Sequence, residues 1–450
     1  MSEIFGAVNT GNSGMRGGCS CSGRSARERQ RQAVRSRARE RVILTKSSTE
    51  LVRQQNSMLV LSALRRHGRL AHTEISDQTR LASATVSAIT AELERAHLIE
   101  RTEVQPVGGR GRPRVLFEQR RDCAYLAVVV ISSDAVQYSL VDYSGRLLDR
   151  FAELRPATTG ADLFARTVRD GLERLAGRAR IERNRILVIS ISSKGIVDPG
   201  RPVLVWSPVL GADRIDFADA LRPDWQAEIM LANETLLVAS ALGTTMEKTG
   251  LHPGFRSLAA LSLGHSIGLG IVSQTGTDHH VSALNFGHML HVPDGALCRC
   301  GSRGCIEAYA GFYAVLRGAF EVPTDTIPAK FVPLAEMDKI AASARQGNRI
   351  AGFAFRQAGL ALGNGLARMF SLHDRMPVVL TGPGTRYFDL LQKGMEEGLS
   401  QSQIVRLEGM PPLSVAADEQ NLVFQGHLNR ALAAIDRSVL GFRQSAAVAS

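Results

Sequence analysis

The sequence predicts an α/β protein of several domains, in which a short helical segment precedes a longer region of alternating strands and helices. Its 450 residues exceed what one ordinary hydrophobic core organises. After Arg121, continuous apolar runs such as Tyr125–Ile131 predict buried strands, whereas before it apolar residues recur at helical spacing. Arginine is concentrated near the amino terminus. Together these observations predict three folded domains behind a basic arm.

The composition indicates the cellular compartment of the protein. Hydrophobic residues make up 44% of the chain, but no apolar run approaches the ~20 residues that cross a bilayer, and the start lacks a signal-peptide core. The six cysteines form no disulfide framework. We therefore expect a cytoplasmic protein with no membrane partner.

The amino-terminal arm carries much of the positive charge. The formal net charge is +11, and between Arg24 and Arg41 eight arginines face two glutamates. This segment has no apolar face, so residues 1–48 are expected to be a disordered arm that attracts phosphates without reading sequence. An extended start without a specific role is the alternative.

Three helices are expected next. Apolar spacing predicts the first over Ser57–Arg66, and the second is expected to begin at Thr73, whose hydroxyl can cap it, and to run to Thr79. Ser83 is the expected cap of the third. Its predicted buried stripe consists of Val86, Ile89 and Leu93.

The opposite face of the third helix is small and polar. Such a surface can enter the major groove of DNA, where hydroxyls bond base edges or phosphates. The expected contact residues on this helix are Ser83, Ala84, Thr85, Ser87 and Ala88. A small helical bundle that does not bind DNA is the alternative.

A basic hairpin favours DNA. Strands are expected over Leu98–Arg101 and Val115–Phe117, joined by a turn rich in glycine. Arg110, Arg112 and Arg114 can contact phosphates or the minor groove there. We therefore expect residues 49–120 to form a DNA-binding domain.

Three cysteines and a histidine form a candidate metal site. His288, Cys298, Cys300 and Cys305 supply one nitrogen and three sulfurs within a short, glycine-rich loop. Zinc takes this ligand set tetrahedrally, and a shell filled by four protein ligands is structural rather than catalytic. We predict a structural Zn²⁺. Three unrelated thiols beside a core histidine are the alternative.

Two features of the sequence resemble the ROK family of repressors and sugar kinases. One is the zinc loop, and the other is the order of two helices, a third helix with Ser-x-Thr-Val-Ser, and a Gly-Arg-Pro wing. The resemblance implies a winged helix-turn-helix joined to a two-lobed, actin-like (ribonuclease H-like) sugar-kinase fold. It places the arm at 1–48, the DNA-binding domain at 49–120, the first lobe at 121–231 plus about 427–450, and the second lobe at 232–426.

The phosphate-binding motifs of the family's kinases are altered here. The stretch that matches their first hairpin is Val130–Asp134, where valine replaces the metal-facing acid, Ser132 and Ser133 replace the glycine pair and aspartate replaces threonine. The second loop, Gly264–Gly268, contains His265. Because phosphoryl transfer depends on positioning and neutralising phosphates, we expect no enzymatic activity.

The pocket keeps polar groups. By resemblance, Asn233 and Glu234 stand at the kinases' Asn-Asp dyad, and Asn285, His288 and Glu307 at their sugar-and-zinc motif. These five are the expected ligand-binding residues. A vestigial pocket, in which they satisfy one another, is the alternative.

The expected function is a repressor of carbohydrate genes, controlled by a sugar or sugar phosphate whose binding changes the angle between the lobes. We expect a homodimer or homotetramer on an inverted-repeat operator in double-stranded DNA. A sugar kinase with an added DNA head is the second interpretation. A ligand-independent regulator controlled by a protein partner is the third.

Overall fold

The computed structural model describes residues 49–104, 114–132, 135–155, 160–208, 210, 213–249, 255–275 and 278–441. The predicted arm, Arg110, Arg112, Ser133 and Asp134 lie outside these ranges. In the described ranges no helix is both long and apolar enough to cross a membrane.

The first part of the fold is a small helical domain with a hairpin. Its first helix spans residues 49–67, an earlier start than the predicted Ser57. The remaining elements are α2 (His72–Thr79), α3 (Ser83–Arg95), β1 (Ile99–Val104) and β2 (Arg114–Gln119). β1 and β2 pair antiparallel, and a single bridge joins Leu70 to Phe117. The predicted stripe of α3 is buried with Leu61, Ile75 and Phe117 in one core. We call residues 57–104 and 114–120 the head.

Both predicted helix caps are wrong. α2 begins one residue before Thr73, and the Glu74 carboxylate accepts the Ala71 N–H at 2.7 Å instead. Ser83 is the first helical residue of α3, and the N-cap position is Ala82, which has no side chain to accept a bond. In α2, therefore, an acidic side chain in the first turn replaces the expected hydroxyl cap.

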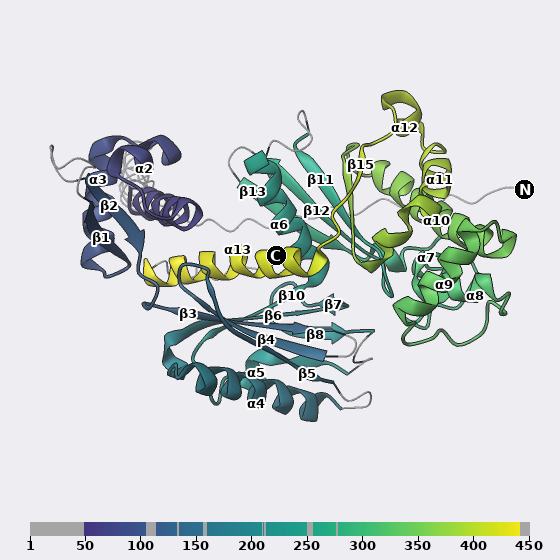
Figure 1. Cartoon of the computed structure of the whole chain (residues 1–450), viewed down its shortest axis with the longest axis horizontal. Helices are drawn as coiled ribbons and strands as arrows, with labels where there is room; N and C mark the ends of the chain where they lie inside the picture. The colour runs from purple at the N-terminus through teal and green to yellow at the C-terminus, as the bar shows by residue number, and fades with distance from the viewer. Residues whose placement is uncertain are drawn as a thin grey trace, which may run out of the picture. The chain divides into compact units, whose positions relative to one another are not determined.

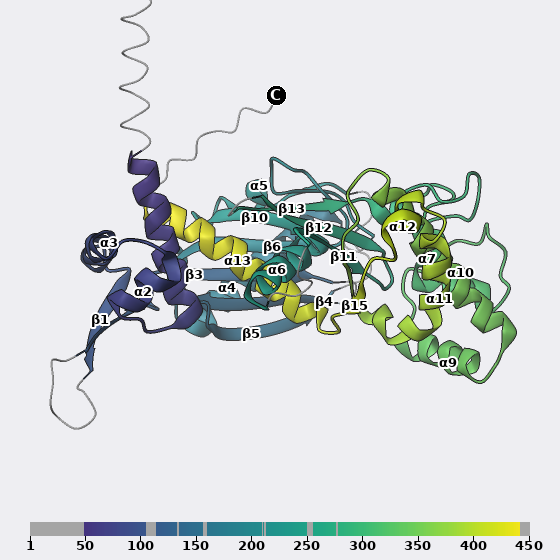
Figure 2. The ribbon, with the colours of Figure 1, turned by 90° about the horizontal axis from the view of Figure 1, so that it is seen from above.

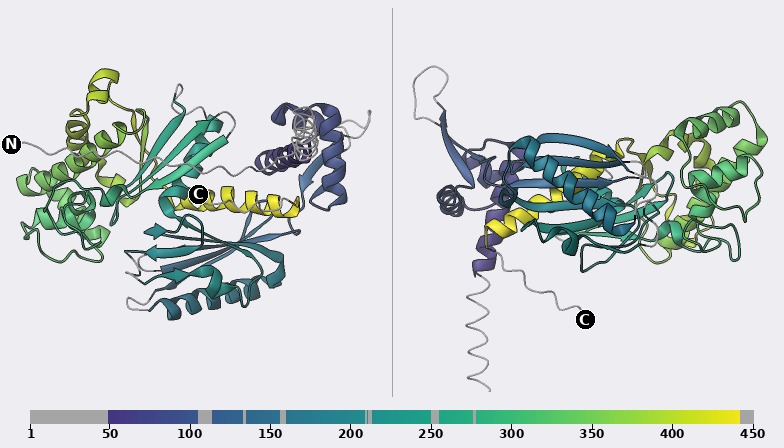
Figure 3. Two further views of the ribbon diagram at one scale, coloured as in Figure 1. Left: turned by 180° about the vertical axis from the view of Figure 1, so that it is seen from behind. Right: turned by 90° about the horizontal axis from the view of Figure 1, so that it is seen from below.

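A five-stranded sheet organises the first lobe, in the order β10-β6-β3-β4-β5 (Figure 1). β3 pairs parallel with β6 and antiparallel with β4. Helices α4 and α5 cover one face, as the view from behind shows (Figure 3), while α13 packs on the other. The elements are β3 (Tyr125–Ile131), β4 (Ala135–Asp142), β5 (Leu147–Leu154), α4 (Ala161–Ala179), η1 (Arg183–Arg185), β6 (Ile186–Ser193), α5 (Phe217–Leu221) and β10 (Glu228–Asn233). A small sheet of β7 (Ile196–Val197), β8 (Val203–Trp206) and β9 (Ile215–Asp216) follows β6.

A second five-stranded sheet, in the order β13-β12-β11-β14-β15, organises the second lobe. Its strands are β11 (Ser257–Ser262), β12 (Gly268–Thr275), β13 (Asp278–Leu284), β14 (Val378–Thr381) and β15 (Leu413–Val415). One core packs this sheet against α8, α9, α10 and α11. The helices are η2 (Phe286–His288), α7 (Glu307–Ala310), α8 (Phe312–Ala319), α9 (Leu334–Arg345), α10 (Arg349–Phe370), η3 (Pro383–Tyr387), α11 (Phe388–Leu399) and α12 (Gln403–Glu408).

Two helices connect the lobes. α6 (Glu234–Thr249) follows β10 directly, and α13 (Glu419–Val439) lies beside it (Figure 2). Val423, near the start of α13, packs with the second sheet, whereas Leu428, Leu432 and Ile435 pack with the first. The two sheets therefore share one helix.

Candidate functional site

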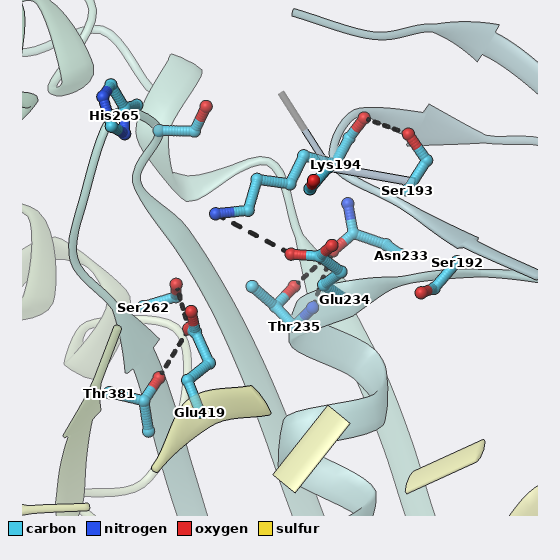
Figure 4. A network of polar contacts seen from close by, with 12 residues as sticks. Ser192, Ser193, Lys194, Asn233, Glu234, Thr235, Ser262, His265, Thr381 and Glu419 are labelled. Atoms are coloured by element: carbon cyan, nitrogen blue, oxygen red, sulfur yellow. Dashed lines mark hydrogen bonds and ion pairs between the residues drawn. The ribbon is translucent and has the colours of Figure 1, made fainter. Parts of the chain in front are cut away.

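Polar side chains gather where strands of both sheets end (Figure 4). Lys194 follows β6, Asn233 ends β10, Ser262 ends β11 and Thr381 ends β14. β6 and β10 are parallel, and so are β11 and β14, so each pair of strands ends at one edge of its sheet. Ligands of open α/β sheets bind outside the carboxyl ends of the strands. This polar network is the candidate ligand site.

The Asn233 side chain is already held on both sides. Its Nδ2 donates to the Gly195 carbonyl at 2.5 Å, and its Oδ1 accepts from the Thr235 N–H at 2.9 Å and hydroxyl at 2.7 Å. Asn233 therefore fixes the loop after β6 against the start of α6.

Glu234 faces a cation that the sequence did not single out. The Lys194 ammonium lies 3.7 Å from its carboxylate, with the two side chains 27% and 11% exposed. Burial raises the pKa of Glu234 to about 6, although Lys194 opposes the shift. Burial alone would lower the pKa of Lys194, but Glu234 and Glu419 outweigh it and raise that pKa. Each of the two side chains therefore favours the charged form of the other.

Glu419 brings a second carboxylate to the strand ends. The hydroxyls of Ser262 and Thr381 donate to its Oε1, the latter at 3.1 Å. These residues precede the glycine turns at Gly264 and Gly382, to which the resemblance to sugar kinases assigns phosphate binding. A carboxylate at this place repels an incoming phosphate.

The side chain of Arg299, from the metal loop, contacts the predicted second phosphate loop. Its Nη2 donates to the His265 carbonyl, to Ser266 Oγ at 3.1 Å and to Glu307 Oε1 at 3.2 Å. Glu307 is 1% exposed, and its other oxygen accepts the Ile267 N–H at 3.2 Å. The predicted ligand residue Glu307 thus braces this loop.

The four predicted metal ligands come together. The donor atoms of His288, Cys298, Cys300 and Cys305 all lie within 4.8 Å of one another. Cys298 Sγ lies 3.7 Å from His288 Nδ1, and Cys300 Sγ lies 3.7 Å from Cys305 Sγ. A tetrahedral zinc site with Zn–S bonds of about 2.3 Å places its sulfurs about 3.8 Å apart. The residues therefore fit zinc in donor type, number and spacing.

The metal loop is stabilised by its surroundings. Gly301 and Gly304 have φ of +88° and +78°, the left-handed region that glycine enters without strain. The Tyr313 hydroxyl donates to Cys298 Sγ at 3.5 Å. Trp206, from the first lobe, meets the His288 ring edge-on with centroids 5.4 Å apart. A residue of the first lobe therefore contacts the metal loop.

The structure divides the five predicted ligand residues into two groups. Asn233 and Glu234 adjoin Lys194, while His288 and Glu307 belong to the loop that contains the metal ligands and Arg299. Asn285, just before η2, is exposed. Sequence reasoning missed Lys194, Arg299 and Glu419. A charged residue directly after a buried strand, as at Lys194, was the available signal.

The candidate DNA surface lies on α3. Ser83, Ala84, Ser87 and Ala88 are exposed, and Thr85 is half-buried, as the helical spacing predicted. Arg114 reaches Glu74 of α2 at 2.6 Å. The head thus presents a small, polar helix face, and Arg114 at the start of β2 is paired with an acidic residue of α2.

The sequence pattern of the ROK family matches residues 128–428, and a winged helix-turn-helix DNA-binding pattern matches residues 53–100. The chain belongs to the ROK family. The predicted order of a winged helix-turn-helix followed by a ROK domain is confirmed.

Curated repressors align with most of this chain. The chain is 22% identical to the DNA-binding transcriptional repressor Mlc of Escherichia coli (strain K12), over 78% of this chain and 87% of Mlc. It is 24% identical to the xylose repressor of Caldicellulosiruptor bescii, over 79% and 90%. The glucokinase of Streptomyces coelicolor is 29% identical, over only 56% of this chain and 80% of the enzyme.

Solved structures share the fold. A ROK family transcriptional regulator described as a homologue of E. coli Mlc superposes with a TM-score of 0.65 at 20% identity, covering 87% of this chain and 99% of the other. The ROK hexokinase of Thermus thermophilus reaches 0.50 at 22% identity, over 69% and 97%. The predicted actin-like kinase fold behind a DNA-binding head is therefore confirmed.

Proposed function

We propose that this ROK protein is a DNA-binding transcriptional regulator, a repressor of carbohydrate genes, whose affinity for DNA is controlled by a sugar or sugar phosphate. The proposal rests on the buried and exposed faces of α3. Its apolar stripe is buried in the head, while Ser83, Ala84, Ser87 and Ala88 stand exposed. Small residues on such a face let a helix enter the major groove.

The cleft supplies the ligand site in this proposal. Lys194 and Glu234 face it from the first lobe, and Asn285 lies exposed at the start of the metal loop. A structural Zn²⁺ held by His288, Cys298, Cys300 and Cys305 fixes the shape of that loop. The repressors Mlc and xylose repressor align over most of their length, which supports the same arrangement of head and cleft.

Loss of kinase activity is part of the proposal. Glu419 brings negative charge to the strand ends, where it repels a phosphate. Lys194 pairs with the carboxylate at the position that the resemblance gives to the catalytic base. Phosphoryl transfer needs a free base and a cradle that neutralises phosphates, and these two contacts oppose both.

A kinase with an added DNA head is the second candidate. The similarity to a glucokinase favours it. ATP-dependent phosphorylation of glucose, N-acetylglucosamine or another hexose by zinc-loaded protein would establish it.

We further propose a cytoplasmic homodimer or homotetramer that binds an inverted-repeat operator. Two-fold symmetric proteins match two-fold symmetric sites, with half-sites about one helical turn or a multiple apart.

DNA reading by α3 is tested directly with a matched pair of variants. Ala88→Asp adds a negative charge to the exposed face of α3, and Ala342→Asp does the same on α9, in the second lobe. Affinity for the DNA upstream of its own gene is compared with affinity for a shuffled sequence at fixed salt. We expect Ala88→Asp to remove the preference for the upstream DNA and Ala342→Asp to retain it. Equal behaviour of the two variants would contradict DNA reading by α3.

A further inference from the structure

Helix α13 has a polar anchor in each of three parts of the fold: the second lobe, the first lobe and the head. The anchors are Glu419 at its first residue, His427 in the middle and Asp436 near its end. The helix runs over Glu419–Val439, and at 1.5 Å per residue it is about 30 Å long.

The first anchor, Glu419, belongs to the polar network at the strand ends. Glu419 accepts hydrogen bonds from Ser262 and Thr381, the last residues of two strands of the second lobe. Burial is the largest single influence on the pKa of Lys194 and lowers it. Glu234 and Glu419 together outweigh burial and raise that pKa. Any ligand that contacts Lys194 therefore changes the electrostatic surroundings of Glu419.

The middle anchor fixes α13 on the first lobe. His427 is fully buried, and its ring nitrogens lie 2.7 Å from Ser190 Oγ and 3.0 Å from Ser192 Oγ. Burial lowers the pKa of His427 to about 3, so the ring is neutral. Both serines belong to β6, the strand that leads to Lys194.

The third anchor joins α13 to the head. Asp436 is 2% exposed and accepts two bonds from Arg65, Nη1 to Oδ2 at 2.9 Å and Nη2 to Oδ1 at 2.8 Å. The Tyr143 hydroxyl donates to Oδ1 at 2.7 Å. Val439 and Leu440, just beyond, pack against the core of the head. A buried, bidentate pair of this kind is costly to break on one side only.

We propose that α13 transmits the state of the cleft to the head, and that the Arg65–Asp436 pair is the joint through which it acts. The proposal rests on the proposed function, because it explains how a ligand controls DNA affinity. A ligand that closes the lobes shifts the partners of Glu419 relative to those of His427. A continuous helix held at both points passes that shift to Asp436 as a tilt or a slide. Coupling of this kind requires contacts that differ between two states.

The test needs no identified effector. Glu419→Gln weakens the cleft anchor in the full-length, ligand-free and DNA-free protein, and amide hydrogen exchange is measured over residues 57–67 of the head. Glu153→Gln, which weakens the Arg174–Glu153 pair between β5 and α4, is the control. We expect exchange in the head to become at least about fivefold faster in Glu419→Gln and to remain unchanged in the control, because local opening follows the loss of stabilising contacts.

A second variant locates the joint. In an Asp436→Asn background, which keeps the size of the side chain and removes its charge, Glu419→Gln should produce no further change in the head. Thr381→Val, which removes one bond to Glu419, provides an independent perturbation should Glu419→Gln disturb folding. Unchanged exchange in the head, with altered exchange at β11 and β14, would overturn the proposal. A wild-type protein that shows no specific DNA binding would instead count against the proposed function, and it would not affect the exchange result, because that measurement involves no DNA.

Discussion

The Lys194 ammonium lies 3.7 Å from the Glu234 carboxylate, the group that the resemblance to the family's kinases places at the position of their general base. The pair sits at the ends of β6 and β10, two parallel strands of the first lobe. It places a cation at a site for which the resemblance implied no lysine or arginine.

The raised pKa of Glu234 predicts that the free energy of unfolding depends on pH. Its folded value of about 6 exceeds its ordinary value of 4.5, so the unfolded chain releases this proton at lower pH. Stability from this group is therefore lost as the pH rises from 4.5 to 6. Between pH 4 and 7, the free energy of unfolding of the wild type should fall by about 2 kcal/mol more than that of Glu234→Gln. Parallel pH profiles from chemical denaturation would contradict the assignment.

Replacing one metal ligand should release the metal. Cys300→Ser removes one of four donors, and we expect its zinc content to fall well below one ion per chain, measured by elemental analysis after dialysis. Cys123→Ser is the control, because Cys123 is a half-buried free cysteine whose thiol bonds the Arg120 carbonyl. Full zinc content in Cys300→Ser would sink the metal site.

Two glycines of the metal loop should respond differently to a methyl group. A Cβ on Gly304 would lie 1.8 Å from the Val292 carbonyl oxygen, whereas a Cβ on Gly301 meets nothing within 4 Å. Both have positive φ, so Gly301→Ala carries only backbone strain of about 1 kcal/mol. We expect Gly304→Ala to lose zinc and Gly301→Ala to retain it in competition with a chelator. Equal retention would show that the close approach at Gly304 is unimportant.

Nucleotide should not stabilise this protein. Glu419 lies beside the glycine turn at Gly382, which the resemblance assigns to phosphate binding, and its negative charge opposes a phosphate there. The Arg299 guanidinium is already bonded to Ser266 and Glu307. A nucleotide at about 100 times its Kd would add about 2.7 kcal/mol. We expect Mg-ATP to leave the thermal midpoint unchanged. A saturable rise in that midpoint would favour the kinase interpretation.

Local sequence patterns predicted much of the fold. β3 spans Tyr125–Ile131 as expected, because a short, continuous apolar run rich in valine is typical of a strand buried on both faces. The stripe of α3 and the four metal ligands were also predicted, since both depend on short spacings. The caps at Thr73 and Ser83 were wrong because a short polar side chain near a helix start does not reveal which residue begins the helix.

The rest of the site could not be predicted from local sequence. Glu419 lies 157 positions from Ser262, and Asp436 lies 371 positions from Arg65, so only the folded sheets bring them together. Arg299 stands between two metal-binding cysteines, where the motif drew attention to its neighbours. Long-range polar contacts of this kind leave no periodic signal.

The measurement that tests the account most directly is a DNA-binding titration of the zinc-loaded protein on its own upstream region, at fixed salt, against a panel of sugars and sugar phosphates. We predict a specific footprint that one compound releases, with a matching change in the fluorescence of Trp206, which lies beside the metal loop. A footprint that no compound alters would contradict ligand control and point to a protein partner. The absence of any footprint would contradict DNA reading by the head.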